Sequence, residues 1–122
     1  GGIDGIAYTA ISTKDTAQVI IQVKSGHVGE KDIRDLIGTV KVAGAVMGYM
    51  LTLEEPTAPM KSKANSAGVY KHPLMGKSYP IISIITIKEI IEGGVRISLP
   101  LPKDVVRSAR GKDAVEQHSL PI

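Results

Sequence analysis

Apolar residues recur along the first part of the chain at the spacing of strands. Ile3–Ile11 alternates weakly between apolar and polar positions, and a polar turn follows it. Ala17–Lys24 then contains the run Val19–Val23, which is rich in β-branched residues and is broken only by Gln22. Such a run is typical of a strand in the middle of a sheet, buried on both faces. We therefore predict that these two segments pair as an antiparallel hairpin.

The period then changes to that of a helix. Apolar residues recur three or four positions apart after a glycine-bearing loop. On the polar side, Glu30–Arg34 and Lys31–Asp35 place opposite charges four residues apart, and such pairs stabilise a helix. The pattern predicts a helix from about Glu30 to Ala45.

Short strands and helices alternate in the second half of the chain. Met47–Leu53 and Ile81–Ile85 are apolar and predict two more buried strands. Between them, Thr57 can cap a helix that runs to Ala67 and stops at a glycine. The sequence Thr86-Ile87-Lys88-Glu89 has the form of a capping box and predicts a short third helix.

The order of these elements is hairpin, helix, strand, helix, strand, helix. A strand–helix–strand unit within one sheet is parallel with a right-handed crossover, so we predict an α/β fold with a mixed central sheet flanked by helices. The segment Tyr70–Pro80 shows no period and is expected to be irregular. We expect the domain to span residues 1–102, followed by a loosely ordered or partly helical tail over residues 103–122.

Composition narrows the class of protein. The chain has no cysteine, so it can form neither disulfides nor thiolate metal sites. No apolar run approaches the ~18 residues of a membrane span, and the start lacks the pattern of a signal peptide. We therefore expect a cytoplasmic protein with no membrane partner. The chain opens on Gly-Gly rather than Met, which suggests a fragment of a longer polypeptide.

The net charge of +3 is unevenly distributed along the chain. Pro56–Lys88 contains five lysines and no acidic residue, whereas the rest of the chain has 10 basic and 12 acidic residues. A segment of this kind is typical of a surface that binds a polyanion, and the alternative is a lysine-rich surface that contacts only solvent. The predicted phosphate contacts are Lys61, Lys63, Lys71 and Lys77.

Asp4, Gln22 and Lys24 carry the candidate chemistry. Gln22 and Lys24 lie two residues apart on one strand, so their side chains leave the same face. An amide and an ammonium that leave a core strand need partners, because burying polar groups without them is costly. Asp4 is the most economical carboxylate partner, since a hairpin can bring the start of one strand beside the end of the other.

These residues also carry a resemblance. Gly-Ile-Asp-Gly, followed by a strand that bears Gln-x-Lys, resembles the active-site signature of Mrr-like restriction endonucleases, a branch of the PD-(D/E)xK nuclease superfamily. The runs Val28–Leu36, Leu53–Met60 and Ala67–Tyr70 resemble the nuclease-like domain attached to some bacterial site-specific DNA methyltransferases. The similarity spans roughly residues 1–100.

The resemblance implies a restriction-endonuclease-like core of helix, three strands, helix and strand. The aspartate stands on the second strand of that core and Gln-x-Lys on the third, so the N-terminal helix and strand of the family core are missing here. In the family that first helix can contribute an acidic metal ligand, which puts the activity of this fragment alone in question.

The resemblance also implies an activity, which is Mg²⁺-dependent cleavage of double-stranded DNA. Mg²⁺ would be held by the Asp4 carboxylate, the Gln22 side-chain oxygen and the Val23 backbone carbonyl. Lys24 would position or activate the attacking water and stabilise charge on phosphorus. The expected setting is a restriction–modification polypeptide with a linked upstream methyltransferase or other domain, and cleavage of both strands would favour a homodimer.

The candidate residues also have structural interpretations. Asp4 could be a turn acid that bonds its own backbone. Gln22 and Lys24 could face solvent and form a cross-strand pair with Asp4 or Thr9. His27 is interpreted as an exposed loop histidine rather than a base.

Other acids and histidines carry weaker signals. Glu54 and Glu55 at a strand end could join a metal site, but acids are common in strand-to-helix turns. His72 and His118 have no companions at ligand spacing, so no zinc site is predicted. Two alternative functions remain open: a degenerate nuclease fold that only binds DNA beside a methyltransferase, and an ordinary interaction domain.

Overall fold

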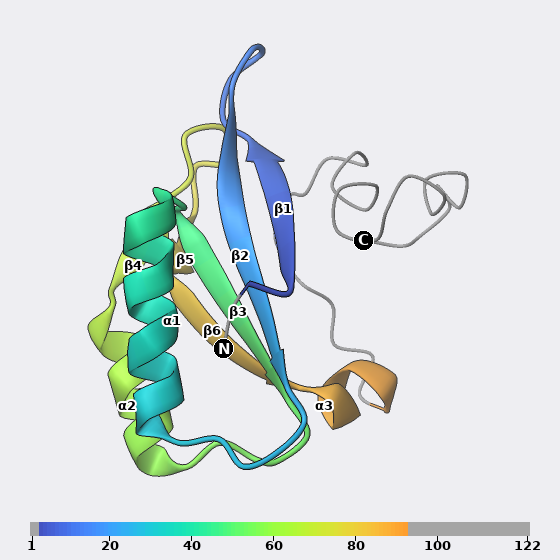
Figure 1. The fold of residues 1–122 in the computed structure, drawn as a ribbon. Coiled ribbons are helices and arrows are strands. Elements are labelled where there is room, and N and C mark those ends of the chain that lie inside the picture. Colours follow the sequence, from blue (N-terminus) through green and yellow to red (C-terminus); the bar gives the residue numbers. More distant parts are fainter. Residues whose placement is uncertain (1–2, 93–122) are drawn as a thin grey trace.

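The computed structural model describes residues 3–92, which are built around a mixed sheet of four strands (Figure 1). In spatial order the strands are β1 (Gly5–Ala10), β2 (Thr16–Lys24), β3 (Met47–Thr52) and β6 (Ile82–Thr86). β1 is antiparallel to β2, whereas β2, β3 and β6 run parallel to one another. The predicted α/β fold with a mixed central sheet flanked by helices is thus confirmed.

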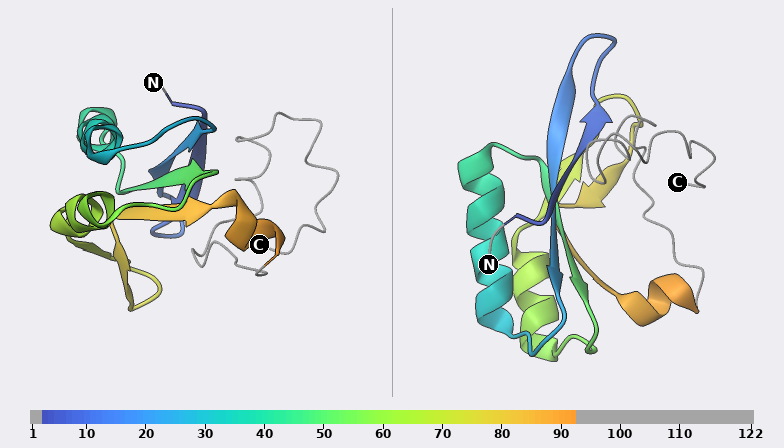
Figure 2. Two further views of the ribbon diagram at one scale, coloured as in Figure 1. Left: turned by 90° about the horizontal axis from the view of Figure 1, so that it is seen from below. Right: turned by 45° about the vertical axis from the view of Figure 1, so that its right-hand side comes forward.

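Helix α1 (Glu30–Ala43) lies beside α2 (Ala58–Ser66), and the two cover one face of the sheet (Figures 1 and 2). α1 forms because its apolar residues fall on one side of the helix. It ends before the predicted Ala45, because Gly44 adopts the left-handed conformation with a φ of 70° and closes the last turn. The buried residues of α1 are Ile33, Leu36 and Val40.

Side-chain caps begin the other two helices, as the sequence predicts. At the start of α2, Thr57 Oγ1 accepts a hydrogen bond from the Met60 N–H at 3.4 Å. At the start of α3 (Ile87–Ile91), Thr86 Oγ1 accepts from the Glu89 N–H at 3.0 Å. The Glu89 carboxylate in turn accepts from the Thr86 N–H at 2.8 Å, which completes the predicted capping box.

The segment Tyr70–Pro80 is more regular than predicted. β4 (Val69–Lys71) and β5 (Ser78–Pro80) pair as an antiparallel hairpin. Each strand has only three residues, which is too short for an alternating pattern to stand out from a loop. The prediction of irregular structure is therefore wrong at both ends of this segment.

Two expectations about side chains are also wrong. Val23, which lies near the end of β2 on the face opposite Gln22, is 46% exposed. The intrahelical pairs Glu30–Arg34 and Lys31–Asp35 are not formed as ion pairs. Within residues 3–92 the ion pairs are Lys24–Asp32 and His27–Glu54, and exposed intrahelical pairs gain too little to hold long side chains in one position.

The sheet separates two apolar clusters. On the helical face, Ile20 and Met50 pack against the apolar sides of α1 and α2. On the other face, Val19 and Tyr49 pack with side chains of the β4–β5 hairpin, among them Tyr79. Each face of β2 therefore meets a different set of neighbours, and the parity of a residue decides which set it meets.

Some sequence predictions fall outside the described residues. These are the end of the third helix at Gly93-Gly94, the domain boundary at residue 102 and the tail over residues 103–122. Within residues 3–92, no helix is both long enough and apolar enough to cross a membrane.

Candidate active site

Asp4 lies beside the end of β2, where the hairpin opens. Its N–H donates to the Ile21 carbonyl at 3.0 Å, and its Oδ2 accepts from the Val23 N–H at 2.7 Å. The carboxylate thus takes a place that a main-chain acceptor would occupy if the strand pairing continued. This bond holds the exposed Asp4 side chain against the backbone of β2 at Val23, whose carbonyl is one of the predicted metal ligands.

Gln22 and Lys24 leave β2 on the helical face. Residues two apart on a strand share a face, so both lie on the same face as Ile20, which belongs to the core beneath α1. Asp4 precedes the paired register, which begins with Gly5 opposite Ile21, and its carboxylate reaches the Val23 N–H, between Gln22 and Lys24 in the sequence. Gln22 is 4% exposed, and Lys24 is half-buried. The structure therefore brings the predicted residues to one end of β2.

The carboxylate nearest to Lys24 is Asp32 rather than Asp4. Lys24 Nζ lies 3.4 Å from Asp32 Oδ1, whereas Asp4 is not within ion-pair distance of Lys24. Asp32 Oδ2 accepts from the Gly29 N–H at 2.8 Å at the start of α1. The hydrogen bond from the Gly29 N–H holds the pKa of Asp32 below its usual value, and the nearby Lys24 ammonium lowers it further.

Sequence reasoning missed Asp32. The available signal was an acid three residues after Gly29, the position that caps a helix by bonding back to the first backbone N–H. That signal predicts a cap but not the contact with Lys24, which depends on how the intervening loop turns. The sequence therefore predicts Asp4 as the carboxylate partner of Lys24, whereas the fold supplies Asp32 from α1.

His27 and Glu54 form a second pair at this end of the sheet. They stand on the loops that follow β2 and β3, with His27 Nδ1 3.5 Å from Glu54 Oε1. Their side chains are 87% and 58% exposed, so the imidazole is a solvated surface group. Such an exposed pair contributes little to stability.

His72 is a structural residue. It is 1% exposed, and its Nδ1 accepts from the N–H groups of Leu74 and Met75 at 3.1 and 3.2 Å. Because Nδ1 accepts, the ring proton lies on Nε2, which donates to Thr9 Oγ1 at 2.9 Å. The imidazole thereby ties the β4–β5 hairpin to β1.

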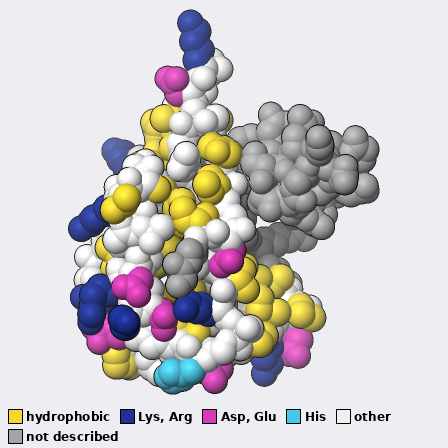
Figure 3. All heavy atoms as spheres, in the orientation of Figure 1, with side chains coloured by type: hydrophobic (Ala, Val, Ile, Leu, Met, Phe, Trp, Pro, Cys, Tyr) yellow, Lys and Arg dark blue, Asp and Glu magenta, His cyan; other side chains and the backbone are white. Residues whose placement is uncertain are grey.

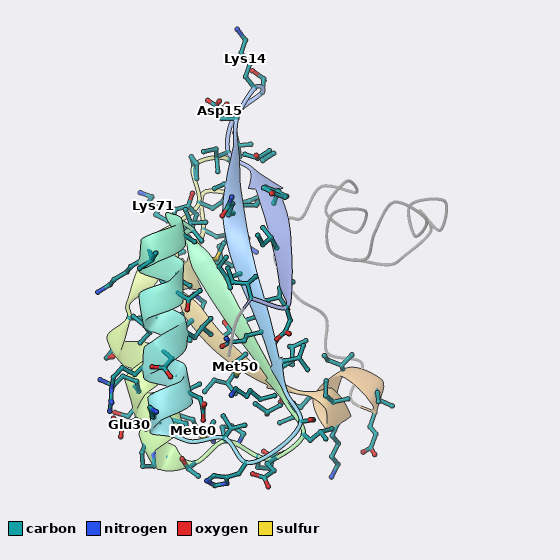
Figure 4. All side chains as sticks on the ribbon, viewed as in Figure 1. Lys14, Asp15, Glu30, Met50, Met60 and Lys71 are labelled. Carbon is teal, nitrogen blue, oxygen red and sulfur yellow. The ribbon has the colours of Figure 1, made fainter. Side chains whose placement is uncertain are left out.

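The four lysines of the basic segment lie at two places. Lys61 and Lys63 belong to α2, and Lys63 lines a groove between α1 and α2. Lys71 and Lys77 belong to the β4–β5 hairpin, where the His72 N–H bonds the Lys77 carbonyl at 2.9 Å. Figure 4 shows Lys71 beside the end of α1 that lies away from Glu30. Basic side chains occupy several separate places on the face shown in Figure 3.

Comparison with known families supports the resemblance seen in the sequence. A family model, Mrr_cat, described as a restriction endonuclease, matches residues 1–91. The chain belongs to this family. The matched residues include Asp4, Gln22 and Lys24, and the mixed α/β structure is consistent with the restriction-endonuclease-like fold. No curated protein and no solved structure gives a significant match.

The donor set of this Mrr_cat domain fits a hard cation. Asp4, Gln22 and the Val23 carbonyl offer oxygen atoms, and Asp4 is exposed with one carboxylate oxygen engaged by the Val23 N–H. Oxygen donors of this kind suit Mg²⁺ rather than zinc. Within residues 3–92, no three or more His, Cys, Asp or Glu side chains gather closely enough to hold a metal ion by themselves.

Proposed function

We propose that this chain is a Mg²⁺-dependent DNA endonuclease domain, which hydrolyses phosphodiester bonds of double-stranded DNA. Membership of a restriction endonuclease family supports the nuclease chemistry. The observation that carries the assignment to these residues is the 2.7 Å bond from the Val23 N–H to Asp4, at the point where Gln22 and Lys24 leave β2. It holds an acid against the strand that bears the amide and the ammonium.

The Asp4 carboxylate, the Gln22 side-chain oxygen and the Val23 carbonyl are the proposed ligands. A bound Mg²⁺ supplies Lewis-acid polarisation of the scissile phosphate and lowers the pKa of water. Gln22 carries no charge where a carboxylate would carry one, so we expect weak metal binding and a single ion. Lys24 orients the attacking water and stabilises the charge that develops on phosphorus.

The Lys24→Ala variant tests this function. Cleavage of double-stranded DNA in the presence of Mg²⁺ should fall to background, because the ammonium that stabilises the developing charge is gone. DNA binding should be mostly retained. Lys14→Ala is the matched control, since Lys14 is an exposed lysine at the far end of the β1–β2 hairpin (Figure 4) and its loss should leave cleavage unchanged.

Chelation provides the second arm of this test. EDTA should abolish cleavage and added Mg²⁺ should restore it. Undiminished cleavage by Lys24→Ala, in preparations free of contaminating nuclease, would refute the assignment of this residue. Cleavage that survives chelation would refute the metal dependence.

The biological setting is a further part of the proposal. We infer a cytoplasmic restriction–modification polypeptide in which a methyltransferase or other domain precedes this one. Cleavage of both strands favours a homodimer, since one site acts on one strand at a time. Chromatography of the full-length protein with and without DNA measures the oligomeric state.

A second candidate is a nuclease fold that only binds DNA beside a methyltransferase. It is favoured by the uncharged Gln22 in the metal site and by the engagement of Lys24 with Asp32. DNA binding with no Mg²⁺-dependent cleavage by the full-length protein would select this alternative.

A further inference from the structure

Lys24 is held by a carboxylate from the next element of the chain. Asp32 Oδ1 lies 3.4 Å from the Lys24 Nζ, while Asp32 Oδ2 accepts from the Gly29 N–H at 2.8 Å. The two oxygens of one carboxylate therefore serve two different partners. The backbone bond orients the carboxylate that faces the ammonium.

Buried residues flank Asp32 on both sides in the sequence. It lies in the first turn of α1 and is followed by Ile33, which is fully buried. Val28, on the other side of the Gly29 cap, is 3% exposed. The loop that links β2 to α1 is thus anchored in the core close to Asp32, so the carboxylate keeps its position relative to β2.

We propose that Asp32 is a positioning residue that holds the Lys24 ammonium on the face of β2 that also bears Gln22, at the end of the strand where Asp4 bonds the Val23 N–H. This inference rests on the proposed nuclease function and deepens it. A lysine side chain has several rotatable bonds, and at the end of a strand it would otherwise sample many positions in solvent. Asp32 does not touch the DNA, and its effect on cleavage passes through Lys24.

The Asp32→Asn variant separates positioning from helix capping. The amide oxygen of asparagine can still accept from the Gly29 N–H, so the cap is preserved, but the charge opposite Lys24 is lost. Asp35→Asn is the matched control: it removes the same charge from an exposed position on α1 that has no ion pair within the described residues. We expect kcat for cleavage by Asp32→Asn to fall about 10- to 100-fold.

The remaining readouts distinguish positioning from general damage. KM and the unfolding midpoint of Asp32→Asn should stay close to wild type, and Asp35→Asn should match wild type in every measurement. A wild-type kcat for Asp32→Asn, alongside an inactive Lys24→Ala, would overturn the positioning role and leave the nuclease function intact. A fully active Lys24→Ala would instead overturn the nuclease function.

A second measurement does not depend on cleavage. An amine-reactive ester acylates accessible lysines, and mass spectrometry gives the rate at Lys24. If Asp32 holds the ammonium, Lys24 should be acylated severalfold faster in Asp32→Asn than in wild type or Asp35→Asn. Equal rates in the three proteins would overturn the positioning role, whether or not the protein cleaves DNA.

Discussion

Two polar clusters lie on opposite faces of the same sheet, and they differ in how completely their groups are bonded. Beneath the β4–β5 hairpin, His72 is 1% exposed and both of its ring nitrogens bond inside the protein. At the other end of β2, Asp4 is exposed, and the Lys24 and Asp32 side chains retain 31% and 25% of their exposure. One cluster is buried and neutral, and the other is accessible and charged.

The difference separates side chains that hold the fold from side chains that can act on a ligand. A buried imidazole with both nitrogens bonded has no capacity left for a metal or a phosphate, and its network stabilises the core. A carboxylate at the surface can exchange water for a cation, and an ammonium can exchange water for a phosphate. Histidine is the more familiar catalytic residue, yet here His72 is structural and the lysine is the candidate.

The largest expected effect comes from the buried cluster. His72→Ala should lower the free energy of unfolding by about 3–5 kcal/mol, because it leaves a cavity and strips Thr9 and two backbone N–H groups of a partner. Urea unfolding measures the loss. His27→Ala, an exposed histidine, serves as the control and should change stability little. A His72→Ala protein as stable as wild type would contradict the conclusion that the buried cluster holds the fold together.

A smaller loss is expected at the point where α1 approaches β3. A Cβ added at Gly48 would lie 2.8 Å from Val40 Cγ2 and 3.3 Å from Leu36 Cδ1. Gly48→Ala should therefore lower the free energy of unfolding by about 1–3 kcal/mol. Gly48 belongs to the core and is not one of the proposed site residues, so the folded fraction should cleave DNA at the wild-type rate. A loss of cleavage in protein that is still folded would indicate that core packing controls the active site.

The predicted phosphate contacts of the basic segment can be tested by removing its lysines in pairs. If each contacts one phosphate, Lys61→Ala with Lys63→Ala should reduce the slope of log affinity against log salt by about 1.8, at roughly 0.9 per phosphate. The pair Lys71→Ala with Lys77→Ala gives the matched comparison from the β4–β5 hairpin. Fluorescence anisotropy with duplex DNA over a salt series measures both slopes, and the pair whose removal leaves the slope unchanged does not face DNA.

The smallest expected effect is the pH dependence of the unfolding free energy that Asp32 contributes. Asp32 has a pKa lowered from its ordinary value of 3.8, chiefly by the Gly29 N–H, so its charged form stabilises the folded state above that value. This contribution is lost as the pH falls below 3.8 through the folded pKa. The difference in unfolding free energy between wild type and Asp32→Asn, about 1 kcal/mol or less at pH 7, should therefore shrink toward zero in acid. A difference that grows in acid would contradict this sign.

The sequence predicts the features that depend on local patterns. The strand parity of Gln22 and Lys24 and the cap at Thr57 follow from spacing alone, since the backbone geometry of each element dictates them. The contact between His72 and Thr9 spans 63 positions, and no local pattern predicts it. The pairing of Lys24 with Asp32 is also missed, because it depends on the path of the loop between β2 and α1, in which Val28 is buried in the core.

The bond between the Val23 amide and the Asp4 carboxylate also makes the site observable from the backbone. An ion that draws electron density from this carboxylate must weaken the bond it accepts, so the amide proton of Val23 should shift in an NMR spectrum as Mg²⁺ is titrated. A single backbone signal would then report occupancy of the site in the absence of DNA, before any phosphodiester is broken.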